Sequence, residues 1–342
     1  MIDLSTDYVG LKLKNPLVPS ASPLSKNLDS ALRLEDAGAG ALVMYSLFEE
    51  QLRAEEAMAD RFLLHADLGH GEADGFLPDH GHFQSSLDQY LEQLRLLKGR
   101  LDIPVIASLN GVSLSGWVEL GQEMQQAGAD ALELNVYHVA AEATYSGEAV
   151  EARYISLLHE LHGSVHVPII MKLSPFFSSL PHFVKQIEQA GARGVALFNR
   201  FMQPDIDLGE TPQDRLRVVD HLALSYPNEA LLRMRWIAIL RGRTALTLAA
   251  TGGVHGYQEA IKLLLAGADV VHLASCLLQH GPDRLTEILR DMEHWMAARE
   301  YASVAQLKGS MSQQHLPDPG AVARASYIRL IERFEPPSGV WR

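Results

Sequence analysis

The sequence holds a single cysteine, Cys276, among its 342 residues. One thiol forms no disulfide within the chain, and it supplies too few thiolates for an iron–sulfur cluster. We therefore expect a reducing, cytoplasmic location. Any iron–sulfur relay would have to come from another chain. Cys276 itself is interpreted as a packed small residue rather than a reactive one.

Basic residues are also scarce, with 29 Lys and Arg against 42 Asp and Glu and a net charge of -13. Such a surface repels phosphate backbones, so we expect no nucleic-acid partner. No stretch approaches the roughly 20 apolar residues that a membrane span needs. The first residues also lack the apolar run with a basic flank that marks a signal peptide. We therefore expect no membrane partner.

A recurring phrase, a glycine-containing turn followed by a short apolar strand, organises the chain. It occurs as AGAGALVMY from Ala37, AGADALELN from Ala127, AGARGVALFN from Ala190 and AGADVVHLA from Ala266. In each phrase, glycine favours the left-handed end of a helix, and the apolar residues form the next strand. This is the joint between helix and strand in an alternating β/α chain.

Four further apolar segments bring the number of expected strands to eight. They are LVPSA at 17–21, IPVIASL at 103–109, VPIIMKL at 167–173 and ALTLAATGG at 245–253. Eight short strands alternating with helices predict an α/β fold of the (β/α)8 TIM-barrel type. An open doubly wound sheet is the alternative, but no GxGxxG motif follows the first strand.

Other segments depart from this repeat. The first dozen residues alternate like a small hairpin that would close the bottom of the barrel. Two insertions, 46–84 after strand 2 and 198–228 after strand 6, fall at the C-terminal face, where barrels build their sites. We expect one domain over 1–342, with the barrel at about 15–300. The extension 301–342 is expected to be helical at first and then proline-rich and loose.

Polar residues end three consecutive strands: Asn135 on strand 4, Lys172 on strand 5 and Asn199 on strand 6. They are expected to converge on one pocket at the barrel mouth. A lysine there stabilises negative charge on a ligand, and amides pair with the edge of a planar heterocycle. The alternative is that each residue caps its own strand.

Small residues follow strands 7 and 8, where barrels commonly bind phosphate through backbone N–H groups. Gly252 and Gly253 follow strand 7, and Ala274 and Ser275 follow strand 8. These positions predict a phosphate site, with simple tight turns as the alternative.

In this order, the motifs of the chain resemble those of the dihydroorotate dehydrogenase family, and of the flavin–pyrimidine barrel of dihydropyrimidine dehydrogenase. The matching stretches span about residues 5–300 and are NPLVPSASP, FLPDHG, VIASLNG, GADALELN, MKLSP, the Asn of LFNR, and TGGV. The resemblance implies an FMN-binding barrel that oxidises or reduces a pyrimidine ring.

The resemblance also implies roles for single residues. Lys172 would stabilise charge on the reduced flavin, and Asp79 of FLPD would stand on a substrate-side loop where the family usually has Asn. The implied cofactor-binding residues are Ser20, Ala21, Asn135, Lys172, Gly252, Gly253, Ala274 and Ser275. The expected substrate-binding residues are Tyr45, Ser46, Asp79, Tyr137 and Asn199.

The chain departs from the family pattern at three places. Tyr45 replaces a lysine after strand 2, although Ser46 persists. After ELN, the family has a catalytic Cys or Ser followed by Pro-Asn, whereas VYHVA places His138 at the base position. The family's GLSG turn reads ALSY around Ser225. The residues that surround FMN in the family are thus mostly kept, and those that surround dihydroorotate are mostly altered.

His138 is chemically competent as a base, since an ordinary histidine has a pKa near ~6.5. The alternative is a surface loop histidine with no role in the chemistry. The insertion after strand 2 is rich in His and Asp between His65 and His82, but its spacing matches no metal-binding signature. We interpret it as a polar lid and expect no metal.

The sequence therefore predicts an FMN-dependent oxidoreductase that converts dihydroorotate to orotate, in pyrimidine biosynthesis, or acts on a related small substrate. A homodimer is expected, with a small acceptor or an electron-transfer partner protein. Three alternatives stay open: an FMN-binding relative with another substrate, a non-catalytic barrel acting as subunit or regulator, and a lyase that uses Lys172 as a Schiff base.

Overall fold

A computed structural model describes residues 2–66, 85–111, 116–201, 203–211, 215–219, 223–333 and 335, without the side chains of residue 56 and of residues 59–66. Eight parallel strands form its central sheet, in the order β3-β12-β11-β8-β7-β6-β5-β4. The terminal strands of this order, β3 and β4, are also in contact, so the sheet is nearly closed. The strands are β3 (Leu17–Pro19), β4 (Leu42–Phe48), β5 (Val105–Gly111), β6 (Ala131–Val136), β7 (Ile169–Leu173), β8 (Gly194–Leu197), β11 (Thr247–Thr251) and β12 (Val270–Leu273).

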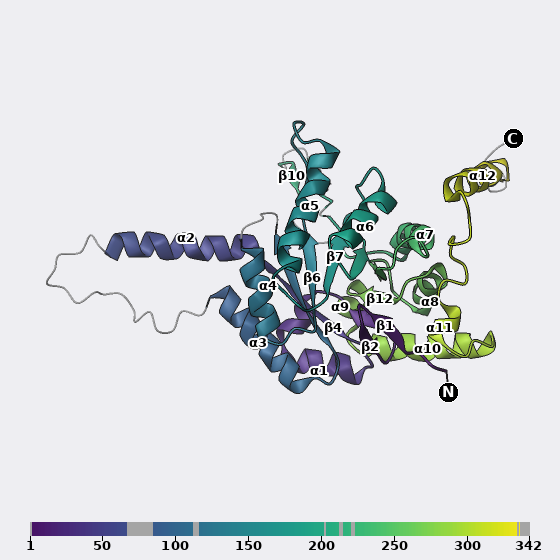
Figure 1. Ribbon diagram of the computed structural model, residues 1–342, viewed down its shortest axis with the longest axis horizontal. Coiled ribbons are helices and arrows are strands. Elements are labelled where there is room, and N and C mark those ends of the chain that lie inside the picture. Colours follow the sequence, from purple (N-terminus) through teal and green to yellow (C-terminus); the bar gives the residue numbers. More distant parts are fainter. Residues whose placement is uncertain are drawn as a thin grey trace.

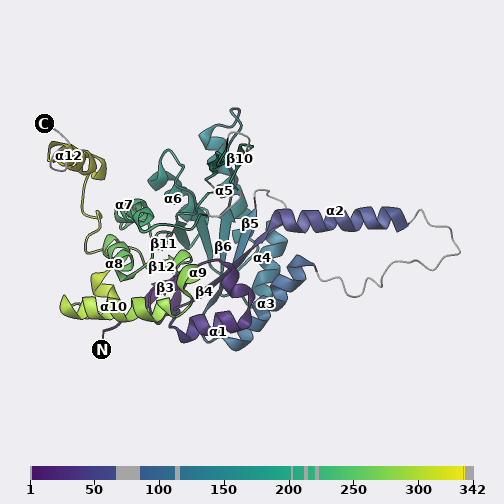
Figure 2. The same cartoon turned by 180° about the vertical axis from the view of Figure 1, so that it is seen from behind.

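Helices surround this sheet on all sides and confirm the predicted (β/α)8 barrel (Figures 1 and 2). Their apolar faces pack with the outward side chains of the strands in one continuous core. The surrounding helices are α1 (Leu28–Asp36), α3 (Ser86–Arg100), α4 (Trp117–Gln126), α5 (Gly147–His162), α6 (Leu180–Gln189), α7 (Ala230–Leu240), α8 (Tyr257–Ala266) and α10 (Arg284–Ala298).

The N-terminal hairpin predicted from the sequence is present as the antiparallel pair β1 (Thr6–Tyr8) and β2 (Leu11–Leu13). Tyr8, Val9 and Leu13 are buried against the inward apolar residues of the barrel strands, such as Val18 and Val270. The hairpin therefore closes the N-terminal end of the barrel.

The barrel interior changes from apolar to polar along its axis. Strand side chains alternate between the two faces of a sheet, so residues two apart share a face. Ala131, Ile170 and Val270 belong to the apolar layer above the hairpin. Two residues further along their strands come Glu133, Lys172 and His272, all buried. The C-terminal half of the interior therefore holds charged and polar groups, which places the chemistry there.

The insertion after β4 begins with an 18-residue helix, α2 (Glu49–Ala66), which projects away from the barrel (Figure 1). The expected polar lid over 46–84 is therefore helical in its first part. Residues 67–84, including Asp79 and the FLPD motif, lie outside the described residues. The insertion after β8 holds a short antiparallel pair, β9 (Ile206–Asp207) and β10 (Arg217–Val218), and a 3-10 turn, η3 (Pro227–Glu229).

The C-terminal extension differs from the expected order of a helix followed by a loose segment. After a single turn, α11 (Val304–Leu307), a longer helix α12 (Pro319–Glu332) follows the proline-rich stretch. The Asp318 side chain accepts from the N–H of Ala321, and Pro319 occupies the first turn. Proline at this position begins a helix rather than ending one, because its missing N–H needs no partner there.

Candidate active site

A cavity of about 200 Å³ lies among the C-terminal ends of the barrel strands. The ends of β3, β7, β8, β11 and β12 contribute to its wall, together with the insertion after β8. It brings together most of the cofactor-binding residues predicted from the sequence. Those that line it are Ser20, Ala21, Lys172, Gly252, Gly253, Ala274 and Ser275, and the predicted substrate residue Asn199 lines it too.

Lys172 is buried at this cavity and is paired with a carboxylate that sequence reasoning missed. Its Nζ lies 3.1 Å from Oε1 of Glu133, a fully buried residue of the neighbouring strand β6. The signal for Glu133 was a charged residue inside the apolar run ALELN. A buried cation and anion in contact neutralise each other in an interior where either alone would be strongly destabilising.

The part of the cavity wall at the end of β12 carries small residues and hydroxyl groups. The Ser225 N–H and Oγ both donate to Oγ of Ser275, at 3.0 and 2.8 Å, and Ser225 is buried. Helix α9 (Ser275–His280) starts here, and its capping position, Ala274, supplies no side-chain acceptor for the first N–H groups. This part of the wall therefore offers hydroxyls and backbone donors, which are the groups that bind phosphate.

Gly253 follows β11 at a point where the chain packs directly against the backbone at the start of α7. Its φ is +81°, and an added Cβ would lie 2.4 Å from the backbone nitrogen of Ala230. Gly252 has a φ of +95°, and its Cβ would lie 2.8 Å from Nη2 of Arg233. Arg233 is itself buried and donates to the carbonyls of Thr251 and Glu229, both at 2.9 Å. The glycine pair thus lets the strand end pack closely on η3 and α7.

Replacing Gly253 with Ala is expected to destabilise the protein by at least ~2 kcal/mol, since backbone strain and a clash with main-chain atoms add together. Gly10 is the matched control, because its φ is +95° and no atom lies within 4 Å of an added Cβ. Gly10→Ala is expected to cost about 1 kcal/mol from strain alone. Urea denaturation of both variants measures the difference, and equal losses would contradict the packing role of Gly253.

The amides predicted at the mouth are hydrogen-bonded to each other. Nδ2 of Asn199 donates to Oδ1 of Asn135 at 2.7 Å, and the Asn199 backbone N–H donates to the carbonyl of Leu173 at 2.7 Å. Asn135 is buried and pairs in register with Lys172. Asn199 lines the cavity, whereas the predicted cofactor residue Asn135 does not.

A register shift between Val43 and Ser46 in β4 places Tyr45 on the helix side of the sheet instead of on the inner side with Val43. Ser46 shares a hydrogen bond of 2.9 Å with Ser108 of β5. Tyr45 instead stands edge-on to Tyr90 of α3, at 4.9 Å between ring centroids, and lies beneath the Lys26 ammonium. Neither residue lines the 200 Å³ cavity.

The loop after β6 places Tyr137 and His138 outside that cavity as well. The ring centroid of Phe201 lies 4.4 Å from that of Tyr137 and 5.7 Å from that of Phe176. His138 contacts Arg153 of α5, with Nη1 3.3 Å from its Nε2. Partial burial, and then the Arg153 charge, lower the pKa of His138, so its imidazole is neutral at pH 7. A neutral imidazole is the form that accepts a proton.

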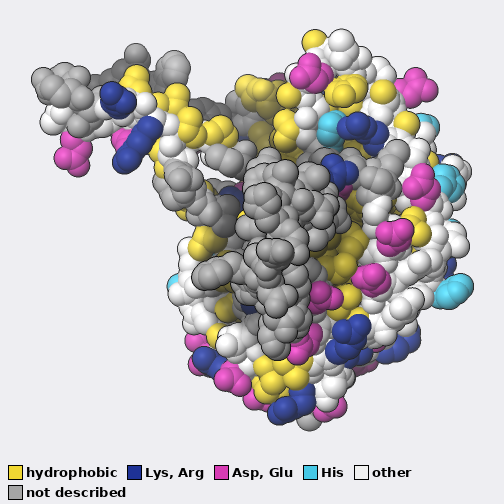
Figure 3. Space-filling view, turned by 90° about the vertical axis from the view of Figure 1, so that its left-hand side faces the viewer, with side chains coloured by type: hydrophobic (Ala, Val, Ile, Leu, Met, Phe, Trp, Pro, Cys, Tyr) yellow, Lys and Arg dark blue, Asp and Glu magenta, His cyan; other side chains and the backbone are white. Residues whose placement is uncertain are grey.

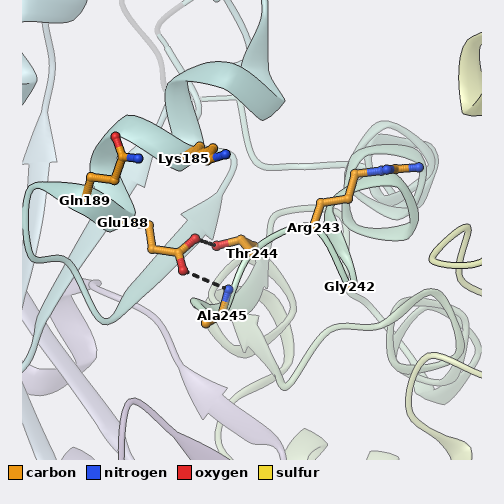
Figure 4. Close-up of a pocket in the computed structure, with 7 residues that line it drawn as sticks. All are labelled: Lys185, Glu188, Gln189, Gly242, Arg243, Thr244 and Ala245. Atoms are coloured by element: carbon orange, nitrogen blue, oxygen red, sulfur yellow. Dashed lines mark hydrogen bonds between the residues drawn. The ribbon is translucent and has the colours of Figure 1, made fainter.

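Another hollow lies at the opposite end of the barrel, between the end of α6 and the segment leading into β11 (Figure 4). There the carboxylate of Glu188 already accepts hydrogen bonds from the Thr244 hydroxyl at 2.6 Å and the Ala245 N–H at 3.2 Å. Active sites of this fold are built at the C-terminal face, so we assign the chemistry to the 200 Å³ cavity.

Figure 3 shows acidic and basic side chains interspersed over one face of the molecule. Among the described residues, none of the helices combines the length and the apolar character that crossing a membrane requires. The same described residues contain no cluster of three or more His, Cys, Asp or Glu placed to hold a metal ion.

The chemistry of the cavity wall fits FMN. The hydroxyls of Ser225 and Ser275 and the start of α9, which lacks a side-chain cap, are groups that bind phosphate. The buried Lys172 lines the same cavity and would stabilise negative charge on a planar ring. Fold and site together define a (β/α)8-barrel protein with a polar cavity at the C-terminal ends of its strands.

Comparison with known proteins places the chain within this class. The family model described as dihydroorotate dehydrogenase matches residues 3–296. The chain belongs to the dihydroorotate dehydrogenase family and is accordingly an oxidoreductase acting on CH–CH groups.

Three relatives illustrate the similarity. The catalytic subunit of dihydroorotate dehydrogenase B (NAD(+)) from Thermoplasma acidophilum is 27% identical over 316 residues, which cover 90% of this chain and 99% of the relative. Dihydroorotate dehydrogenase A (fumarate) from Lactobacillus delbrueckii subsp. bulgaricus is 26% identical, with 83% and 90% covered. The NAD-dependent dihydropyrimidine dehydrogenase subunit PreA of Escherichia coli is 24% identical, with 92% and 78% covered.

Proposed function

We propose that the chain is an FMN-dependent dehydrogenase that oxidises dihydroorotate or a related small substrate. The observation that carries this proposal is the pairing of two features in one cavity. Lys172 is buried in the cavity wall, and the Gly252–Gly253 turn, Ser225 and Ser275 line the same cavity. When bound, FMN would supply the hydride acceptor.

Different residues of the cavity would bind the phosphate and the ring system of that cofactor. The N–H groups at the start of α9 and the hydroxyls of Ser225 and Ser275 would bind the phosphate, while Ser20 and Ala21 would lie along the ring. Lys172 would stabilise negative charge that develops on the ring system. Lys172 is paired with the buried Glu133 carboxylate, whereas a Schiff-base lyase needs a lysine amine that is free to attack its substrate. This favours the dehydrogenase over the lyase.

On the substrate side, Asn135 and Asn199 are proposed to bind a polar ring edge, and His138 is proposed as the base that takes a proton from a substrate carbon. The neutral state of His138 supports this role. Its position on the loop after β6, beside Arg153, is compatible with a substrate that enters from the mouth. Tyr45, Ser46, Tyr137 and, in the insertion after β4, Asp79 are proposed as further substrate contacts.

An FMN-binding relative with a different substrate is the second candidate. The aromatic group of Tyr137, Phe176 and Phe201 favours it, because Phe176 is 72% exposed and presents an apolar ring at the mouth. Such a group suits a substrate that is flatter or less polar than dihydroorotate.

Relatives named as a catalytic subunit or a dehydrogenase subunit suggest that this chain also passes electrons to a partner. We propose a small acceptor or an electron-transfer protein for that step, and a homodimer as the assembly. A cytoplasmic role in pyrimidine biosynthesis is proposed with the dihydroorotate assignment.

Anaerobic mixing of the FMN-loaded protein with dihydroorotate separates the two substrate candidates. If the first is right, absorbance near ~450 nm bleaches within seconds of mixing. No bleaching with dihydroorotate, but full bleaching with dithionite, would overturn the dihydroorotate assignment while leaving FMN binding intact.

A further inference from the structure

The polar layer inside the barrel contains buried atoms that lack hydrogen-bond partners. Among the described residues these include Tyr8 Oη, Glu133 Oε2 and both ring nitrogens of His272. Buried polar atoms are nearly always satisfied, so several unsatisfied atoms in one place point to a missing water or to a functional site. These atoms lie within one cluster, between the hairpin and the 200 Å³ cavity.

His272 links this cluster to the cavity. It is 1% exposed, yet it is among the residues that line the same cavity as Lys172. Its Nδ1 lies 3.8 Å from Oε2 of Glu133, and the other Glu133 oxygen accepts from Lys172 at 3.1 Å. The edge of the Tyr8 ring approaches His272 at 5.7 Å between centroids. The 3.8 Å gap is longer than a hydrogen bond, and a small shift or one bridging water would close it.

The charge state of this cluster follows from burial. Burial lowers the pKa of His272 to about 4, with Lys172 acting in the same direction and Glu133 against it. Burial also raises the pKa of Tyr8 well above its usual range, and the charges of Glu133 and Asp269 add to that rise. At pH 7 both His272 and Tyr8 are neutral. The charges facing His272 are therefore those of the Lys172–Glu133 pair, which cancel.

We propose that His272 is a positioning residue, whose Nδ1–H is directed at Glu133 Oε2 and holds the Glu133 carboxylate aligned on Lys172. We call Glu133, Lys172 and His272 the cavity floor. The net charge that the cavity floor presents to a ligand then depends on an imidazole that need not touch the substrate. The consequence for the cofactor rests on the proposed function.

The physical reason is the number of donors available to Glu133. In the described residues its carboxylate accepts from Lys172 on one oxygen, while the other has no hydrogen-bond partner and lies 3.8 Å from Nδ1 of His272. A buried carboxylate with one donor removed favours its protonated form. Lys172 would then face the cavity as an unbalanced cation. A purely space-filling His272 would have no such effect, because any side chain of similar size would serve equally well.

The tautomer of His272 is measured by ¹⁵N NMR of the full chain labelled at histidine, before FMN is added. The sequence has 15 histidines, and the His272 signal is identified by its loss in His272→Gln. We expect a neutral ring with the proton on Nδ1, unchanged between pH 6 and 9. A proton fixed on Nε2, or a titration with a midpoint near ~6.5, would overturn the proposal.

The effect of His272 on the charge of the cavity floor is measured by the ratio of the dissociation constants for oxidised and reduced FMN at pH 7. His272→Leu, which has no donor, is expected to raise this ratio about tenfold in favour of reduced, anionic FMN. For a two-electron couple that is about 30 mV. His272→Gln keeps a donor and is expected to stay within about twofold of the wild type.

Equal ratios in the Leu and Gln variants would show that His272 only fills space, and would overturn the proposal. A wild-type His272 ring with its proton on Nε2 would overturn the proposal independently. If the full chain binds no FMN at all, the proposed function fails, and the NMR experiment still decides whether His272 is directed at Glu133.

Discussion

Lys172→Met is expected to weaken FMN binding by tenfold to 100-fold, and to slow substrate-driven flavin reduction by at least 100-fold. Lys172 is the buried cation of the cavity, and its Nζ is within 3.1 Å of Glu133. Methionine keeps most of the side-chain volume but removes the charge that would stabilise a reduced ring. Fluorescence titration with FMN and anaerobic stopped-flow reduction measure the two effects.

The substitution also leaves Glu133 buried without its partner. Removing one member of a buried ion pair destabilises proteins by ~3–5 kcal/mol, unless the remaining group becomes protonated. The double variant Lys172→Met/Glu133→Gln is the matched control, because it removes both charges and keeps the shape. We expect it to fold as stably as the wild type, while reduction stays slow. Wild-type reduction rates in either variant would remove Lys172 from the mechanism.

His138→Ala is expected to lower substrate-driven flavin reduction by 100-fold to 10,000-fold, with FMN affinity unchanged. This range is typical of losing a general base. The His138 side chain does not line the cavity that would hold the cofactor, which is why binding should survive. Rapid-mixing reduction, with FMN titration of the same preparation, separates the two quantities. Turnover that persists at the wild-type rate would place the base elsewhere.

The pH profile gives a second test of the same residue. Because burial and Arg153 lower the pKa of His138, the neutral, proton-accepting form persists below pH ~6.5. The rate of reduction should therefore fall only on the acid side of that value. Arg153→Gln removes the neighbouring positive charge, so the acid limb should move to higher pH. An acid limb that stays in place in Arg153→Gln would contradict the assignment.

Some features of the molecule could be predicted from short-range patterns. The glycine-strand phrases located four of the eight barrel strands because a helix end and a buried strand both depend on a few adjacent residues. Gly252, Gly253, Ala274 and Ser275 reached one cavity because the ends of parallel strands meet at one face of a barrel.

Other features depended on contacts that the sequence does not record. The turn of Tyr45 toward Tyr90 comes from a register shift in β4, which no local pattern reveals. The pairing of Lys172 with Glu133 is one such contact, since the two residues are 39 apart along the chain and only the barrel brings them together. His272 and Glu133 stand inside apolar strands, and charged or polar residues there are the signal that was available.

Titration of the FMN-free chain with FMN tests the central assignment most directly. We predict one FMN per chain, with a flavin absorbance band near ~450 nm that stays with the protein through gel filtration. We further predict that this binding weakens by at least tenfold in Lys172→Met. A folded chain that stays colourless after incubation with excess FMN would contradict the account.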